Sequence, residues 1–202
     1  MTTGTKPAVS AVILAAGASQ RMGASKAALR LGSKTFVEHL VHRLAPVTTQ
    51  ISIVSGAHPI QAPHHAHVDV HVVAAKHWRR GMRASLSAGL RTHREHRVII
   101  THIDRPLIRI ETLLRLLKTP VDRSVIPVFR GCLGHPVVLP AHRVNQFIGQ
   151  DVRPLRWFIP DPQTLFVTVD DPGVILNIND PREYARCRFL FGKSSLSACI
   201  HE

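Results

Sequence analysis

The stretch from Val9 to Lys26 places the strongest constraint on how this chain folds. It reads VSAVILAAGASQRMGASK, an apolar run that ends at Gly17 and continues into a loop of small residues. An apolar run of this length bounded by glycine is typical of a buried strand. Because small residues let backbone N–H groups approach a ligand closely, the loop suits an anion. Arg21 and Lys26 add the charges that bind phosphate oxygens.

The rest of the chain alternates strand patterns with helix patterns, which predicts an α/β fold. We expect a single three-layer α/β/α domain at residues 8–190, with a Rossmann-like, mainly parallel sheet. Residues 1–7 are expected to be disordered, and residues 191–202 form a tail without a clear signal. The expected strands are 9–16, 51–54, 68–74, 98–103, 125–128, part of 131–139, 165–169 and 174–178. The expected helices are 36–44, 81–90, 110–117, 143–148 and one beginning at Pro181.

Composition narrows the class of protein. Hydrophobic residues make up 45% of the 202 residues without a long apolar run, which argues against a disordered chain and against a membrane span. Three cysteines without C-x-x-C spacing predict reduced thiols and a cytoplasmic protein. The net charge of +13 suits nucleic acid, an anionic surface or small polyanionic substrates. The basic residues are dispersed and lack interleaved aromatic residues, which disfavours nucleic acid.

The loop differs from the two commonest phosphate-binding motifs. Five residues separate Gly17 from Gly23, and neither Walker A nor G-x-G-x-x-G is present. Instead, L-A-A-G-x-S-x-R-M-G-x-x-K resembles the signature loop of the MobA-like nucleotidyltransferases, and within them the molybdenum cofactor cytidylyltransferases. The resemblance implies a fold of the nucleotidyltransferase type. It also implies that the nucleotide is bound by Leu14, Ala15, Ala16, Gly17, Arg21, Met22, Gly23 and Lys26.

Asp104 is the main candidate for a metal ligand. It follows an apolar strand and precedes Arg105-Pro106, so its carboxylate is placed either to hold Mg²⁺ between phosphate oxygens or to cap the next helix. The segment IITHIDRPLI resembles the D-x-P metal motif of the same family and favours Mg²⁺. The segment from Leu176 to Tyr184 resembles the family's closing motif, which implies that Asn177 and Asn179 complete the metal site.

Two further segments resemble family elements that contact substrates. The segment HWRRGMRASL implies that Trp78 and Ser85 line the nucleotide pocket, although Trp78 is equally well explained by core packing. The segment GCLGHPVV implies that Gly134 and His135 lie on the acceptor side, and a structural role in a turn remains the alternative for His135. A weaker match at 151–156 adds Arg156 to the acceptor side.

The histidine-rich segment around His65, His67 and His71 suggests a second kind of site. With Asp69 these residues fall at alternate positions and can share one strand face. Such a face would hold zinc or nickel, or would simply be solvated.

Together these elements predict transfer of a nucleoside monophosphate onto a phosphorylated acceptor. The resemblance implies CTP, or another NTP, as donor and a molybdopterin-type acceptor, with pyrophosphate released. Arg21, Lys26 and Asp104 would carry the chemistry. Two alternatives stay open: a transferase of the same fold with another phosphorylated acceptor, and a non-catalytic nucleotide- or cofactor-binding accessory protein that serves a molybdoenzyme client.

Overall fold

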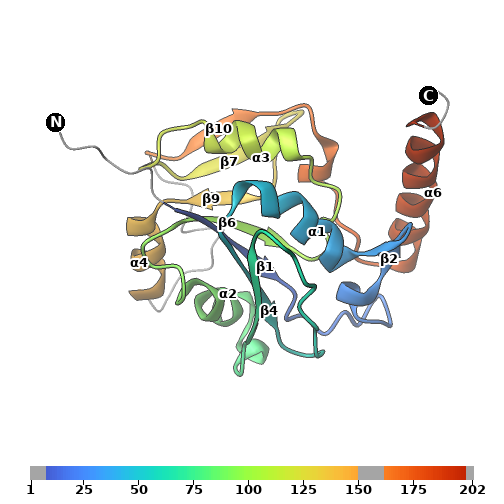
Figure 1. The fold of residues 1–202 in the computed structure, drawn as a ribbon, viewed down its shortest axis with the longest axis horizontal. Helices are drawn as coiled ribbons and strands as arrows, with labels where there is room; N and C mark the ends of the chain where they lie inside the picture. Colours follow the sequence, from blue (N-terminus) through green and yellow to red (C-terminus); the bar gives the residue numbers. More distant parts are fainter. Residues whose placement is uncertain (1–7, 150–161, 199–202) are drawn as a thin grey trace.

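The computed structural model describes residues 8–149 and 162–198, which form a sheet with helices on both faces (Figure 1). The strands are β1 (Val9–Leu14), β2 (Arg30–Leu31), β3 (Lys34–Thr35), β4 (Gln50–Ser55), β5 (Asp69–Ala74), β6 (Arg97–His102), β7 (Val125–Phe129), β8 (Cys132–Leu133), β9 (Val137–Leu139) and β10 (Leu165–Thr168). The helices are α1 (Phe36–Leu44), α2 (Met82–Leu90), α3 (Ile110–Leu117), α4 (Ala141–Gly149) and α6 (Pro181–Ala198). Short 3-10 turns are η1 (Lys26–Ala28), η2 (Ala45–Val47), η3 (Trp78–Arg80) and η4 (Pro172–Val174).

The main sheet is mostly parallel, as predicted. Its strand order is β10-β7-β9-β6-β1-β4-β5, and β8 pairs with β7. Strands β4 and β6 run parallel to β1, and β5 runs parallel to β4. Strand β9 is antiparallel to both β6 and β7. Leu14 pairs with His102, so β1 and β6 end side by side. In open α/β sheets, ligands bind beyond such strand ends where the chain order reverses.

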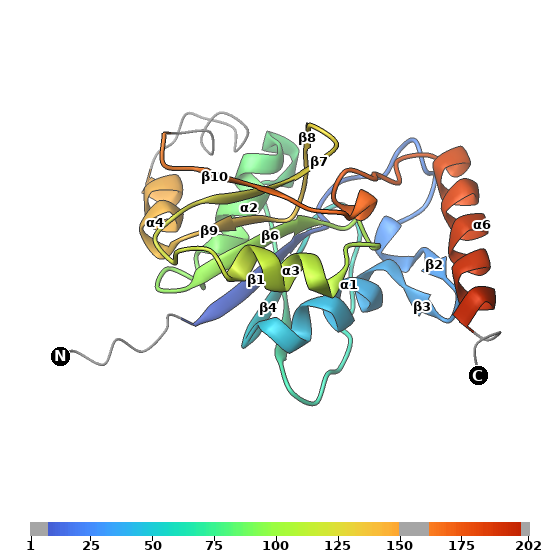
Figure 2. The same ribbon diagram turned by 90° about the horizontal axis from the view of Figure 1, so that it is seen from above.

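The predicted burial of the first strand on both faces is confirmed. Ala11 and Ile13 face the core under α1 and α3, whereas Val12 and Leu14 face the core under α2 and α4. Figure 2 shows these two helix pairs on opposite sides of the sheet. Side chains that alternate along a strand point to opposite faces, so an uninterrupted apolar run is what a covered central strand requires.

Three local features differ from the sequence prediction. In the segment predicted as a strand at 174–178, Val174 is the last residue of the 3-10 turn η4 and the remaining residues form no strand. Asp171 accepts a hydrogen bond from the Gly173 N–H (2.8 Å), and Pro172 lacks a ladder donor, so a turn is favoured. The β2–β3 hairpin was not predicted. Helix α6 begins at Pro181 as predicted but continues to residue 198, past the expected domain end at 190.

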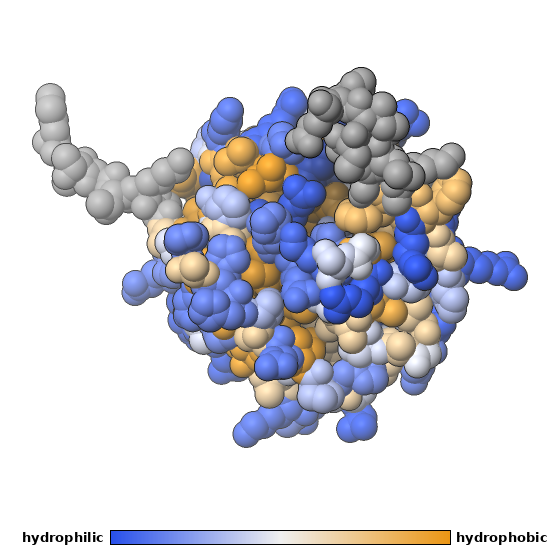
Figure 3. Space-filling view, turned by 45° about the vertical axis from the view of Figure 1, so that its right-hand side comes forward, coloured by the Kyte–Doolittle hydropathy of each residue, from blue (hydrophilic) through white to orange (hydrophobic). Residues whose placement is uncertain are grey.

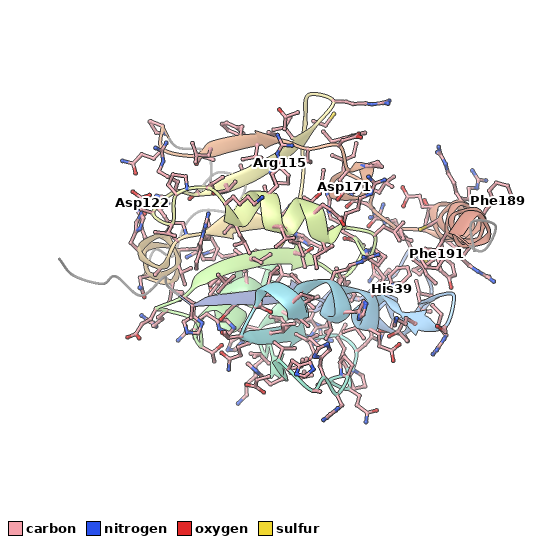
Figure 4. All side chains as sticks on the ribbon, turned by 45° about the horizontal axis from the view of Figure 1, so that its top comes forward. His39, Arg115, Asp122, Asp171, Phe189 and Phe191 are labelled. Atoms are coloured by element: carbon pink, nitrogen blue, oxygen red, sulfur yellow. The ribbon has the colours of Figure 1, made fainter. Side chains whose placement is uncertain are left out.

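Helix α6 lies at one end of the molecule beside the β2–β3 hairpin (Figures 1 and 2). Phe191 makes an edge-on ring contact with His39 of α1, and Tyr184 donates a hydrogen bond to the Arg30 carbonyl (2.7 Å). Figure 4 shows Phe189 on the same helix pointing away from the body. Hydrophilic and apolar residues are interspersed on the face drawn in Figure 3. Among the described residues, no helix combines the length and apolar character needed to cross a bilayer.

Candidate nucleotide-binding site

The loop after β1 is held by hydrogen bonds from both neighbouring strands. The Ala15 N–H donates to the Val54 carbonyl (3.0 Å), and the Ile103 N–H donates to the Leu14 carbonyl (3.0 Å). Farther along, the loop turns sharply at Ser19, which has φ of 52°, and at Gly23, which has φ of 71°. Such positive φ values are unstrained for glycine and uncommon for serine. The loop therefore leaves the sheet in a fixed direction.

This loop forms one wall of a cleft with a volume of about 490 Å³. The opposite wall comes from η3 and the first turn of α2, and the floor comes from the end of β6 and from Asn179. The cleft therefore gathers segments that are distant in sequence. The predicted residues that line it are Leu14, Ala15, Ala16, Gly17, Arg21, Lys26, Trp78, Ser85, Asp104 and Asn179.

Lys26 connects the two halves of the cleft floor. Its Nζ lies 3.2 Å from Asp104 Oδ2 and donates to Asn179 Oδ1 at 2.8 Å. The Lys26 and Asp104 side chains are only 12% and 20% exposed, so solvent screens the pair weakly. The Ile178 N–H donates to the Asp104 carbonyl (2.9 Å), and this backbone contact brings Asn179 to the floor.

The oxygen atoms around Lys26 fit a divalent cation. Asp104 Oδ2 and Asn179 Oδ1 already converge on one positive group. Asp104 Oδ1 is buried and finds no hydrogen-bond partner among the described residues. Mg²⁺ takes one or two carboxylates together with neutral oxygens and substrate phosphates. Asn177, the third predicted ligand, is exposed and does not line the cleft.

Two histidines lie at the floor of the cleft: His102 is part of the lining, and His135 packs against it. The rings of His102 and His135 meet edge-on with their centroids 4.5 Å apart. Burial lowers the pKa of His135 to about 3, and His102 and Arg105 shift it in the same direction. Burial also lowers the pKa of His102, while Asp104 opposes this shift. These shifts favour the neutral form of both imidazoles. Among the described residues, Lys26 forms the ion pair with the Asp104 carboxylate.

Gly134 and His135, predicted on the acceptor side, are placed by contacts with the turn at Val174. The Gly134 N–H donates to the Pro127 carbonyl and the His135 N–H donates to the Val174 carbonyl, each at 2.8 Å. A Cβ atom at Gly134 would lie 2.7 Å from the Val174 carbonyl oxygen. Glycine is therefore needed for this close approach. Neither residue lines the cleft itself; His135 reaches it through the ring of His102.

Some residues of the cleft were not predicted, and others that were predicted lie elsewhere. Arg79 was not predicted, but it lines the cleft with its guanidinium 4.7 Å from the Trp78 ring centroid. Its position next to Trp78, a predicted pocket residue, is the sequence signal that could have indicated it. Met22 is buried in the core below the loop, and Gly23 is exposed; neither lines the cleft. Arg156 lies outside the described residues.

The histidine-rich segment does not assemble a metal site. In the parts of the chain that the structure describes, no group of three or more His, Cys, Asp or Glu side chains is arranged to hold an ion. His71 is 2.7 Å from the Ser52 hydroxyl instead, and His65 and His67 contact each other edge-on. Among the described residues, Cys132 and Cys187 are free, and Cys199 lies outside them.

Comparison with known proteins identifies the family. Residues 11–150 match the model of the MobA-like NTP transferase domain, which is more than half of the chain. The chain belongs to this family. The segment matched contains the loop after β1, Trp78 and Asp104, and Asn179 lies beyond it.

Two curated relatives are molybdenum cofactor nucleotidyltransferases. A probable molybdenum cofactor guanylyltransferase of Carboxydothermus hydrogenoformans is 27% identical and aligns with 89% of this chain and 94% of its own length. The molybdenum cofactor cytidylyltransferase of Escherichia coli is 21% identical and aligns with 88% of this chain and 94% of its own length. The two relatives differ in the nucleotide that their names specify.

Solved structures share the fold. A nucleotidyl transferase from Methanothermobacter superposes with a TM-score of 0.74 at 22% identity, covering 93% of this chain and 99% of its own. A Mycobacterium tuberculosis protein solved as a complex with manganese superposes with a TM-score of 0.63 at 22% identity. The superposition covers 90% of this chain and 98% of the other. These likenesses confirm the predicted α/β fold of the nucleotidyltransferase type.

Proposed function

We propose that this protein transfers a nucleoside monophosphate, with CTP as the donor, onto the phosphate of a molybdopterin-type cofactor and releases pyrophosphate. Membership of the MobA-like family and the two curated relatives support a nucleotidyltransferase of molybdenum cofactor biosynthesis. The observation that carries the proposal is the Lys26–Asp104–Asn179 contact on the floor of a cleft walled by the phosphate-binding loop.

The reaction requires alignment and charge more than a base. A phosphate oxygen of the acceptor is already ionised near neutral pH and attacks the α-phosphorus, forming one P–O bond while the bond to the β-phosphate oxygen breaks. Negative charge then develops on the pyrophosphate. Arg21 and Lys26 line the cleft where they can stabilise this charge, and preorganised charges of this type contribute a few kcal/mol each.

Asp104 and Asn179 are the residues that would hold Mg²⁺. When bound, the ion would supply positive charge that offsets the negative charge of the nucleotide phosphates. Asp104 Oδ1 is buried and has no hydrogen-bond partner within residues 8–149 and 162–198, which supports this role, because such a carboxylate oxygen is costly unless a cation or donor compensates it. An amide oxygen at Asn179 binds Mg²⁺ without adding charge, so we expect weaker metal binding than with two carboxylates.

The proposal of CTP rests on the L-A-A-G form of the loop and on the G-x-x-G-H-P-V form of the segment around His135. The residues Leu14 to Gly17 line the cleft where the loop leaves β1. The N-I-N form of the closing segment is familiar from guanylyl relatives and favours GTP. These two sequence patterns favour different bases, so measuring turnover with each nucleotide distinguishes cytosine from guanine.

The test is pyrophosphate release with Mg²⁺ and molybdopterin, measured separately with CTP, GTP, ATP and UTP. We expect release with CTP. Preference for GTP would refute the cytidylyl assignment and retain the transferase. Silence with all four in protein that binds CTP would refute catalysis on this acceptor and favour another phosphorylated acceptor or an accessory role.

Two substitutions distinguish catalysis from a contaminating activity. We expect Lys26→Ala and Asp104→Ala each to abolish turnover while the circular dichroism spectrum stays unchanged. Asp122→Ala is the matched control because Asp122 is exposed and does not line the cleft. Full activity in either cleft variant would refute the assignment.

A further inference from the structure

The loop after β1 is supported from outside the cleft by the segment that follows β4. The Ala57 N–H donates to the Ala16 carbonyl (3.1 Å), and His58 Nε2 lies 3.1 Å from the Ala18 carbonyl oxygen. A carbonyl oxygen only accepts hydrogen bonds, so Nε2 of this imidazole carries the proton and donates. Ala57 and His58 do not line the cleft. The segment therefore fixes the loop without occupying the space in which a nucleotide would bind.

The close approach of this segment requires glycine at position 56. A Cβ atom at Gly56 would lie 2.5 Å from the Ala16 carbonyl oxygen and 2.8 Å from Trp78 Cβ. Both separations are shorter than van der Waals contact, so a larger residue would push the segment away from the loop. The loop and the wall that carries Trp78 therefore pack against one glycine directly after β4. This packing holds His58, two residues further on, in a fixed position.

The two hydrogen bonds set the direction of N–H groups in the loop. A trans peptide is planar, and the carbonyl of one residue points opposite to the N–H of the next. Because the Ala16 and Ala18 carbonyls point toward the segment after β4, the N–H groups of Gly17 and Ser19 point away from it. Gly17, Ala18 and Ser19 line the cleft, whereas His58 does not. The two N–H groups are therefore directed to the cleft side of the loop.

Ser19 has a backbone conformation that suits an anion-binding loop. Its φ of 52° is a left-handed value that is uncommon for serine, and its carbonyl accepts hydrogen bonds from the N–H groups of Met22 (2.9 Å) and Gly23 (3.2 Å). Successive backbone N–H groups beside a left-handed residue form a concave site for anions. A residue keeps such a conformation only where surrounding contacts impose it. Here the hydrogen bond at the Ala18 carbonyl acts on one side and the turn to Gly23 acts on the other.

We propose that His58 is a positioning residue for phosphate binding: it holds the Ala18 carbonyl and thereby aims the Ser19 N–H at a phosphate oxygen of the bound nucleotide. This role of His58 rests on the proposed function only in that the cleft binds a nucleotide. A hydrogen bond from an N–H group to a phosphate oxygen is charge-assisted and depends on its angle, so a misdirected donor weakens binding. The histidine acts through the loop and does not itself contact the substrate.

Isothermal titration calorimetry with pyrophosphate, at physiological salt and without metal, measures the effect on the full chain. His58→Phe keeps an aromatic ring and removes the donor, and we expect it to weaken pyrophosphate binding by about tenfold. His58→Gln places an amide N–H near the position of Nε2 and should restore most of the lost affinity. His42→Phe is the matched control, because His42 is an exposed histidine of α1 that does not line the cleft; its affinity should be unchanged. The thermal unfolding midpoint of each variant checks that the fold is retained.

Nuclear magnetic resonance on protein labelled at its serine amides provides a readout that a purely structural role would not move. Pyrophosphate should shift the Ser19 amide proton downfield in the unmodified protein and in His58→Gln, and by much less in His58→Phe. Equal pyrophosphate affinity in His58→Phe and the unmodified protein, or a Ser19 amide signal that does not move on binding, would refute the role of His58 and leave the proposed function intact.

The proposed function fails in a different way. If pyrophosphate binding and the Ser19 signal change as expected but no nucleotide is turned over, the proposed function is refuted and the role of His58 in phosphate binding is supported. Protein that binds neither pyrophosphate nor CTP would refute both.

Discussion

Replacing Lys26 with methionine should change metal affinity and turnover in opposite directions. The Lys26 ammonium contacts the two oxygens that we assign to the metal, Asp104 Oδ2 at 3.2 Å and Asn179 Oδ1 at 2.8 Å. Without a nucleotide, the ammonium therefore competes with a divalent cation for the same ligands. When phosphates are present they offer the ammonium other partners. Methionine keeps the length of the side chain and removes the ammonium charge together with its hydrogen-bond donors.

The expected magnitude follows from the burial of this contact. With the two charged side chains 12% and 20% exposed, screening is weak, and a hydrogen bond to a charged group contributes about 1.5–3 kcal/mol. Loss of that competition should tighten metal binding to the nucleotide-free protein by roughly 10- to 150-fold. Turnover should fall by roughly 10²-fold or more, because the pyrophosphate loses a positive partner.

Titration of Mn²⁺ monitored by electron paramagnetic resonance measures the affinity directly. Lys34→Met is the control, because Lys34 is exposed and lies in the β2–β3 hairpin; its Mn²⁺ affinity should match that of the unmodified protein. Asp104→Ala should abolish the site with or without Lys26. Unchanged or weaker Mn²⁺ binding in Lys26→Met would refute the assignment of these oxygens to the metal.

Three predictions concern stability. Asp171→Ala should lower the free energy of unfolding by about 2–4 kcal/mol in urea denaturation, because the buried carboxylate accepts hydrogen bonds from the Thr112 hydroxyl and two backbone N–H groups; retention of stability would contradict this role. Gly134→Ala should cost about 1–3 kcal/mol through the clash with Val174, and a fully stable variant would show that the turn shifts freely. Burial lowers the pKa of His93 to about 4, below its usual value of 6.5. The unfolded chain therefore binds a proton at this histidine more tightly than the folded protein does. The free energy of unfolding should fall by about 3 kcal/mol as the pH drops from 6.5 to 4. His93→Gln should flatten this dependence, and an equally steep profile in the variant would assign it to other groups.

Patterns within a short stretch of sequence predicted most of the fold. The apolar run at the start of the chain specified a strand covered on both faces, and helical spacing specified α1 and α3 with their observed ends. The segment 174–178 was predicted wrongly because its apolar residues suit a strand. Its path is instead set by Asp171 and Gly173, which pack against the start of α3 and the chain before it.

The sequence by itself determined that an anion-binding loop follows a buried strand, that Lys26 lies in that loop and that Asp104 ends another strand. It did not determine which of Asn177 and Asn179 joins them, because two residues of the same type at alternate positions carry the same local signal. In the tertiary structure it is Asn179 that contacts Lys26. The two residues are 153 positions apart in sequence, and Lys26 Nζ lies 2.8 Å from Asn179 Oδ1. The physical reason is that strand order and the Ile178–Asp104 backbone contact set that distance, and no local pattern encodes either.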